Sequence, residues 1–202
     1  MMATTHALVG VALALLVAPD GGLVPVAAGA LGGLFPDFDL YAGHRKTLHF
    51  PVYFPLAAAL AAVVALVSPG PATLAAALFL AAAGIHSAMD ALGGGLELRP
   101  WEGNSDRAVY DHFRGRWIAP RRWIRYDGAP EDLLLAGVFG LPAYAVLSGL
   151  AETLVLLALG VSFVYVVLRK PMVWAAERVV DALPAHVVDL VPARFLDPEE
   201  FK

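Results

Sequence analysis

Two residues near the end of an apolar segment, His86 and Asp90, lie four positions apart in the sequence HSAMD. In an α-helix this spacing places both side chains on one face, one turn apart. An imidazole and a carboxylate in that arrangement can reach one metal ion. Further His and Asp residues stand at the ends of other apolar segments, namely His6, Asp37, Asp39, His44 and His49.

These seven side chains form a candidate site for divalent metal ions. The chain has no cysteine, which excludes disulfides, thiolate ligands and cysteine nucleophiles. Any metal must therefore be held by imidazole nitrogen and carboxylate oxygen, a mixture that suits Zn, Mn or Fe. Three carboxylates and four imidazoles in one place would repel one another or lose charge without a cation. We therefore expect one or more divalent ions, and the ligand types alone do not choose among these metals.

Each of these residues also has a purely structural explanation. A histidine at a helix end, such as His6, is often an interfacial hydrogen-bonding group, and the aspartates could cap or terminate helices. The combination favours a metal site, because ionisable groups embedded in a membrane are costly and usually functional. His112 and His186 lie outside the pattern, and we expect them at the surface.

Six apolar runs must position these side chains, and the runs form three pairs. They cover residues 7–18, 23–35, 51–67, 72–85, 133–150 and 154–168, with turns at 19–22, 68–71 and 149–152. About 20 helical residues cross the hydrocarbon layer of a membrane. The last four runs approach this length, whereas the first two are short and would tilt or re-enter the membrane. The sequence predicts an all-α membrane bundle with about six transmembrane segments in three hairpins.

Composition and charge support a membrane protein. The chain is 59% hydrophobic and 16% charged, whereas a soluble domain is typically about half apolar and about a quarter charged. All 14 Lys and Arg residues lie on the side of the hairpins that holds the termini, so that side is predicted to be cytoplasmic. The net charge of −4 gives no reason to expect nucleic acid. No Lys or Arg precedes the first run, so we expect a retained membrane segment rather than a secretory signal.

Two polar stretches complete the predicted organisation. The loop at residues 93–132 carries seven arginines interleaved with aromatic residues, and is either an interfacial anchor or a lid that grips a phosphate or lipid headgroup. The stretch 172–191 is amphipathic and is predicted to lie flat on the bilayer, with a kink at Pro184. We therefore divide the chain into a membrane bundle over residues 1–170, with a cytoplasmic loop over 91–131, and an amphipathic cytoplasmic tail over 171–202.

The motifs resemble those of the predicted membrane-bound metal-dependent hydrolases, a family described as LexA-binding and inner-membrane-associated. The matching residues are Thr5-His6, Pro36-Asp37-Phe38-Asp39, His44-Arg45, His49 and His86-Ser87-Ala88-Met89-Asp90. The family usually has THS around the second histidine of the basic turn, where this chain has Leu48-His49-Phe50. The family is also distantly similar to zinc-dependent phospholipase C, which implies a phosphoester substrate and favours Zn as the metal, with Mn or Fe as alternatives.

The expected function is metal-dependent hydrolysis of a phosphoester or phospholipid-type substrate at the cytoplasmic membrane face. Metal ions make hydroxide available near neutral pH, and pairs of ions stabilise the attacking and leaving oxygens. The expected ligands are His6, Asp37, Asp39, His44, His49, His86 and Asp90. If Asp90 is left free it is a candidate general base, and Arg45 is expected to stabilise charge on the phosphoryl oxygen.

The alternative is a non-enzymatic membrane protein, either an ion transporter or a scaffold, with a transported or structural metal. A transporter usually places its ionisable groups near the bilayer midplane, whereas here they are predicted at one face. The partners expected from the sequence are the bilayer and a lipid or phosphoester substrate. The oligomeric state does not follow from the sequence.

Overall fold

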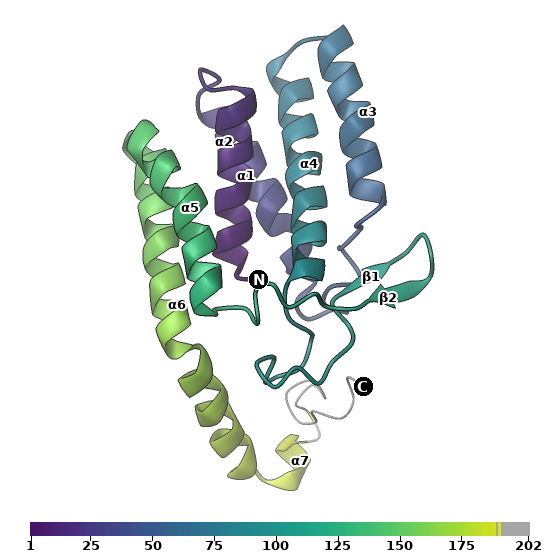
Figure 1. Ribbon diagram of the computed structural model, residues 1–202, viewed down its shortest axis with the longest axis vertical. Coiled ribbons are helices and arrows are strands. Elements are labelled where there is room, and N and C mark those ends of the chain that lie inside the picture. The colour runs from purple at the N-terminus through teal and green to yellow at the C-terminus, as the bar shows by residue number, and fades with distance from the viewer. Residues whose placement is uncertain (189, 191–202) are drawn as a thin grey trace.

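The computed structural model describes residues 1–188 and residue 190, and this part of the chain is mostly helical (Figure 1). The helices are α1 (Ala3–Val17), α2 (Leu23–Leu34), the short 3-10 helix η1 (Phe35–Asp39), α3 (Tyr53–Val67), α4 (Pro71–Leu92), α5 (Pro130–Val146), α6 (Gly149–Asp181) and α7 (Ala185–Val188). Two short strands, β1 (Val109–Asp111) and β2 (Arg116–Ile118), pair antiparallel inside the long polar loop. The predicted all-α fold class is confirmed.

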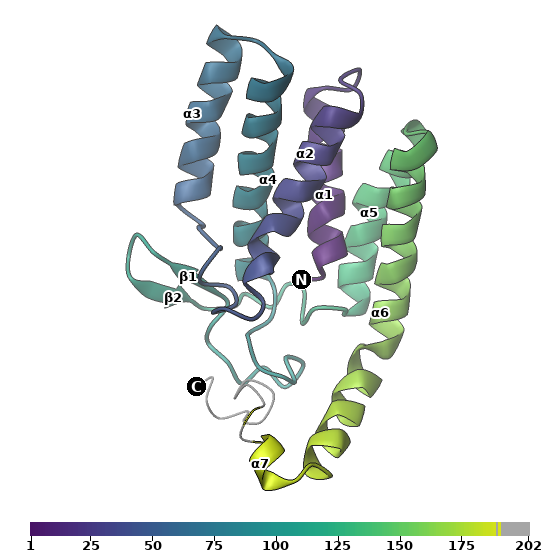
Figure 2. The same ribbon diagram turned by 180° about the vertical axis from the view of Figure 1, so that it is seen from behind.

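The long helices form three antiparallel hairpins, α1–α2, α3–α4 and α5–α6, whose turns all lie at one end of the molecule (Figures 1 and 2). The first turn contains Gly22 with φ 71°, a left-handed conformation that glycine adopts at little cost. The second turn ends at Pro71, which occupies the first position of α4, where a proline needs no amide hydrogen bond. The third turn is Leu147 and Ser148, so the predicted turn residues 149–152 already belong to α6.

Glycines allow α2 to lie in backbone contact with both α1 and α4. A Cβ atom added at Gly33 would lie 2.3 Å from the carbonyl oxygen of His6 in α1. A Cβ atom at Gly32 would lie 2.2 Å from the carbonyl oxygen of Phe79 in α4. Such close approach through small residues is common between membrane helices. It brings the end of α2 against the helix segment that carries His6.

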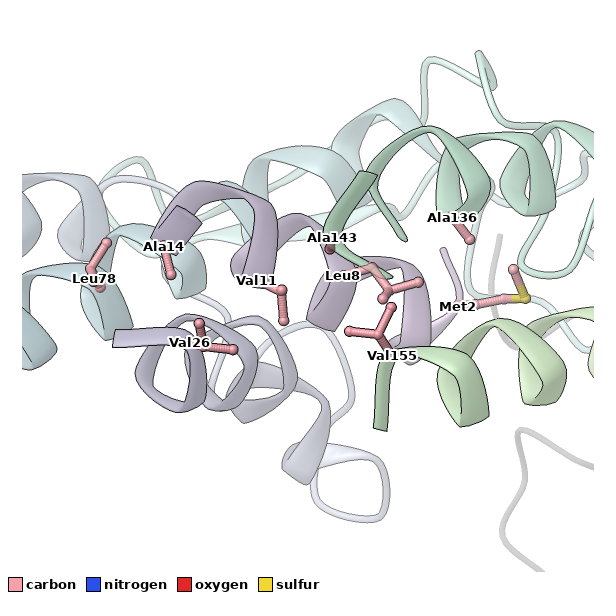
Figure 3. Close-up of a cluster of buried hydrophobic side chains, with 9 residues drawn as sticks. All are labelled: Met2, Leu8, Val11, Ala14, Val26, Leu78, Ala136, Ala143 and Val155. Carbon is pink, nitrogen blue, oxygen red and sulfur yellow. The ribbon is translucent and has the colours of Figure 1, made fainter. Parts of the chain in front are cut away.

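A cluster of buried hydrophobic side chains fills the space where α1 meets its neighbours (Figure 3). Leu8 of α1 is 1% exposed and lies near Ala143 of α5 and Val155 of α6. The cluster comprises Met2, Leu8, Val11, Ala14, Val26, Leu78, Ala136, Ala143 and Val155. The helix α1 is therefore the central element of the bundle, packed between the α2 and α4 side and the α5 and α6 side.

Helix length limits how many of these elements can cross a membrane. By length and composition, α4 with 22 residues and α6 with 33 residues are long and apolar enough. The apolar helices α1 and α3 have 15 residues each, about 22 Å at 1.5 Å per residue, against a hydrocarbon layer of about 30 Å. The lengths of the described helices therefore do not support a bundle of six full spans.

The helix α6 extends well beyond the rest of the bundle (Figure 2). It includes Pro171 and ends at Asp181, so the predicted boundary between residues 170 and 171 falls inside one helix. Most of the predicted interfacial stretch 172–191 is thus the end of α6, followed by the short helix α7 after Pro184. The remainder of the predicted tail, residues 189 and 191–202, lies outside the described residues.

Candidate metal centre

Four of the seven predicted ligands, Asp37, His49, His86 and Asp90, converge, and one ligand atom from each lies within 4.8 Å of the others. The Nε2 atom of His49 lies 3.1 Å from His86 Nε2 and 3.1 Å from Asp90 Oδ2. The Nε2 atom of His86 lies 3.4 Å from Asp90 Oδ2 and 3.5 Å from Asp37 Oδ1. Ligand atoms around a tetrahedral Zn, with bonds of about 2.0–2.1 Å, are about 3.3–3.4 Å apart. The spacing therefore suits one divalent ion.

Each ligand lies at an element end on the side opposite the hairpin turns (Figure 1). Asp37 is in η1, which directly follows α2, and His49 lies in the segment that leads into α3. His86 and Asp90 are one turn apart near the end of α4. Because every hairpin returns the chain to the same end of the bundle, residues distant in sequence meet there.

Hydrogen bonds determine which nitrogen of each ligand histidine faces the centre. The Nδ1 atom of His86 donates to the carbonyl oxygen of Gly33 at 2.6 Å, since a carbonyl can only accept. The Nδ1 atom of His49 donates to Oδ2 of Asp39 at 3.0 Å. In the neutral rings each Nε2 then presents a lone pair towards the centre. These two nitrogen lone pairs face the carboxylates of Asp37 and Asp90. Such a group of electron-rich atoms is stabilised by a cation.

Asp39 was predicted as a ligand, but it lies behind two histidines and outside the four-residue cluster. Its oxygens accept hydrogen bonds from His44 Nδ1 at 3.0 Å, His49 Nδ1 at 3.0 Å and the backbone N–H of Leu48 at 3.0 Å. Burial raises the pKa of this carboxyl, but the hydrogen bonds lower it by more than burial raises it. The pKa is therefore held well below the usual range. A carboxylate in this position orients a metal-bound imidazole and makes it more basic.

His44 is also outside the four-residue cluster. Its side chain is 20% exposed, and its ring stands edge-on to His49 with centroids 5.7 Å apart. Burial lowers the pKa of His44 more than the hydrogen bond to Asp39 raises it. A neutral His44, held by its Nδ1–H, therefore stands beside the centre.

His6 supports the centre from α1. Its ring stacks on His86 with centroids 3.6 Å apart, and its Nε2 lies 3.2 Å from Asp90 Oδ1. Its Nδ1 is buried and has no hydrogen-bond partner in the described part of the chain. His6 contacts two ligands without joining the four-residue cluster.

Solvent reaches the centre on the side of Asp37. The side chain of Asp37 is 21% exposed, whereas those of His49, His86 and Asp90 are at most 1% exposed. Asp37 is therefore the member of the cluster that solvent can reach.

The two residues predicted to be catalytic, Asp90 and Arg45, lie next to each other. Arg45 Nε is 3.5 Å from Asp90 Oδ2, and Arg45 Nη1 donates to the carbonyl oxygen of Gly94 at 2.7 Å. The other oxygen of Asp90 accepts from the Met1 amine at 2.9 Å. Asp90 is thus positioned as a ligand, and Arg45 places a positive charge at the edge of the cluster.

A pocket of about 610 Å³ lies beside the centre, lined by His44 and Arg45, which contact Asp39 and Asp90, but by none of the four cluster residues. It also contains residues that the sequence analysis did not single out. Its lining combines charged and polar groups with apolar ones, including His44, Arg45, Glu97, Asp127, Arg169, Leu96, Met172 and Val173. Glu97 and Asp127 lie in the polar loop among several other acidic residues, and no spacing distinguished them. Only the contacts of the folded loop identify them.

The arginine-rich loop is joined to α6 by ion pairs. Asp127 accepts hydrogen bonds from Arg169 at 2.9 and 3.1 Å, and Arg99 donates to both oxygens of Glu177 at 2.6 Å. Burial raises the pKa of Asp127, but the charge and hydrogen bonds of Arg169 have the larger effect, so the net shift of this pKa is downward. The Arg169 guanidinium also lies 5.6 Å from the ring centroid of Trp101. These contacts hold the loop against α6, and residues of both the loop and α6 line the pocket.

Comparison with protein-family models, with curated proteins and with solved structures gives no match to this chain. The described part of the chain forms a buried cluster of Asp and His residues that could hold a metal ion.

Proposed function

We propose that this protein is a membrane-embedded metal-dependent hydrolase that acts on a phosphoester, of phospholipid type, at the cytoplasmic membrane face. The observation that carries the proposal is the convergence of Asp37, His49, His86 and Asp90 within 4.8 Å beside a partly polar pocket. The resemblance of the motifs to membrane-bound metal-dependent hydrolases supports the same reaction class. Imidazole and carboxylate ligands suit Zn, with Mn and Fe as alternatives.

The residues around the cluster suit hydrolysis. A bound divalent ion supplies hydroxide near neutral pH by lowering the pKa of its water. Asp39 and the Gly33 carbonyl hold the ligand imidazoles in one orientation. Arg45, 3.5 Å from Asp90, offers a guanidinium to a phosphoryl oxygen that approaches the centre.

Membrane insertion is supported by the apolar surface of the helices. In the most apolar part of α6 only 11% of the residues are buried, and Leu157 and Phe163 there are 58% and 60% exposed. Leu66 and Val67, near the α3–α4 turn, are 81% and 82% exposed. We propose that all three hairpins are embedded, that the short helices tilt or thin the bilayer locally, and that both termini are cytoplasmic.

A structural or transported metal is the second candidate. Four protein ligands complete a tetrahedral coordination sphere, as they do in structural zinc sites. A hydrolase needs a position for water, which the exposed Asp37 would have to provide. The two candidates therefore differ in whether the bound ion is reached by substrate.

Metal analysis combined with hydrolysis assays tests the proposal. Protein purified in detergent should contain about one divalent ion per chain and should hydrolyse a phospholipid or a generic phosphodiester. Each of the single variants Asp37→Ala and His86→Ala removes one ligand and should lose the ion. Turnover in each should therefore fall by at least ~100-fold. The matched control His186→Ala, at an exposed histidine outside the cluster, should retain both.

Two results would change the conclusion. A bound ion without turnover on any phosphoester would favour a structural or transported metal. Turnover that is the same in the parent chain and in Asp37→Ala and His86→Ala would remove the hydrolase assignment from this cluster.

A further inference from the structure

A buried carboxylate outside the metal centre has one oxygen without a partner. Glu97 is 5% exposed, and its Oε1 accepts a hydrogen bond from the backbone N–H of Ser105 at 3.2 Å. Its Oε2 is buried without a hydrogen-bond partner in the part of the chain that the structure describes. A buried carboxylate oxygen without a partner is costly, and a donor from outside the chain would satisfy it.

Glu97 lines the pocket that adjoins the metal centre. The loop that carries it is tied to the centre, because Arg45 Nη1 donates to the carbonyl oxygen of Gly94 at 2.7 Å, three residues before Glu97. A Cβ atom at Gly95 would lie 2.8 Å from Ser105 Cβ and 2.9 Å from the Ser105 carbonyl oxygen, as well as 2.3 Å from Glu97 Oε2, so the loop packs closely around a residue without a side chain. The pocket thus has the Arg45 guanidinium near the ligands and the Glu97 carboxylate a short loop away.

The other acidic residue in the pocket lining is already neutralised. Asp127 accepts two hydrogen bonds from Arg169 and one from the Tyr165 hydroxyl at 2.5 Å. The pocket wall also contains the apolar side chains of Met172 and Val173 from the extension of α6. Among the acidic groups described in this lining, Glu97 is therefore the one available to a cationic ligand.

We infer that this pocket binds the headgroup of a lipid phosphoester that carries an ammonium group, with the ammonium at Glu97 and the phosphoryl group towards Arg45. The inference rests on the proposed function for the phosphoryl end of the ligand. An ammonium supplies the charge and the donors that Glu97 Oε2 lacks. A second metal ion suits Glu97 less well, because oxygen-liganded cations need several ligands and this carboxylate stands alone. The apolar part of the wall favours a lipid over a soluble headgroup.

Binding of short-chain lipids to the metal-loaded protein tests this inference. Native mass spectrometry in detergent would follow dihexanoyl phosphatidylethanolamine and dihexanoyl phosphatidylglycerol, and would distinguish bound intact lipid from bound product. We expect the ethanolamine lipid to bind at least ~10-fold more tightly, as a charged hydrogen bond at a buried site would give. The variant Glu97→Gln should abolish this preference while keeping its metal content.

Two controls keep the test decisive. Glu102→Gln makes the same change at a residue whose side chain is 38% exposed and lies outside the pocket lining, and it should leave the preference intact. If Glu97→Gln fails to fold, the parent chain is tested with the N-acetylated ethanolamine lipid, which has lost the ammonium charge. That lipid should bind about as weakly as the glycerol lipid.

Several outcomes would overturn the inference. These are equal affinity of the parent chain for the two lipids, a preference that survives in Glu97→Gln, and tight binding of the N-acetylated lipid. Equal binding of soluble glycerophosphoethanolamine would overturn the assignment to a lipid. A clear preference for the ethanolamine lipid without any product would contradict the proposed hydrolase and would still support the pocket.

Discussion

Hydrogen bonds on the far side of the two ligand histidines decide how their rings point. His49 donates to Asp39, and His86 donates to the carbonyl oxygen of Gly33. A side-chain carboxylate and a backbone carbonyl thus perform the same task for two ligands. Asp39 also accepts from His44, so one substitution there affects two imidazoles.

The variant Asp39→Asn should weaken metal binding by about 10- to 100-fold, because the amide has no charge and only one acceptor oxygen, so its NH₂ group must face the N–H donor of either His44 or His49. Metal affinity measured by competition with a chromophoric chelator would show this change. The matched control Asp20→Asn, at the exposed turn on the opposite end, should bind metal like the parent chain. Unchanged affinity in Asp39→Asn would show that Asp39 does not position His49.

At the scale of elements, the helix α2 determines whether the ligands can meet. It ends in η1, which carries Asp37, and its Gly33 both contacts the backbone of α1 and accepts the hydrogen bond from His86 of α4. The ends of three helices are therefore held together through one residue. The arginine-rich loop adds a second layer, attached to α6 through Asp127 and Arg169.

The variant Gly33→Ala should separate α2 from α1, because the added Cβ would lie 2.3 Å from the carbonyl oxygen of His6. We expect a loss of about 1–3 kcal/mol or more in stability, as for other overpacked sites, together with reduced metal content. Thermal unfolding in detergent and metal analysis would measure the two effects. Gly160→Ala, where nothing lies within 4 Å of the added Cβ, should be neutral or slightly stabilising. Equal behaviour of the two variants would contradict this account of the helix contact.

At the scale of the whole molecule, the helix ends that carry the candidate metal cluster lie at one end, and the hairpin turns lie at the other (Figure 1). The metal cluster, the β-hairpin and the arginine-rich loop share one end, and the three turns share the other. Exposed apolar side chains cover the helices between these ends. This arrangement fits the proposed membrane protein, with its polar end at a membrane surface.

Single cysteines introduced into this cysteine-free chain should reveal the orientation. In intact cells, a membrane-impermeant maleimide should label Ser68→Cys, in the exposed α3–α4 turn, and should not label Asn104→Cys, in the exposed polar loop. After the membrane is permeabilised, both should react. Labelling of Asn104→Cys alone in intact cells would reverse the proposed topology, and labelling of neither there would place both residues on one side of the membrane.

The sequence by itself determined the helical hairpins, because apolar runs and the Gly and Pro residues of turns act locally. It also placed His6, Asp37, His49, His86 and Asp90 at one end, since each hairpin returns the chain to its starting side. The i to i+4 spacing of His86 and Asp90 predicted their shared helix face in the same local way.

Only the tertiary structure decided which of the seven candidate ligands share one ion and what the others do. Asp37 and Asp39 are two residues apart in a 3-10 turn, yet one faces the cluster and the other lies behind two histidines. The difference arises from the packing of α2 between α1 and α4 and from hydrogen bonds between distant segments, which no local pattern encodes. The same holds for Glu97, whose burial and unpaired oxygen exist only once the loop has folded against the bundle.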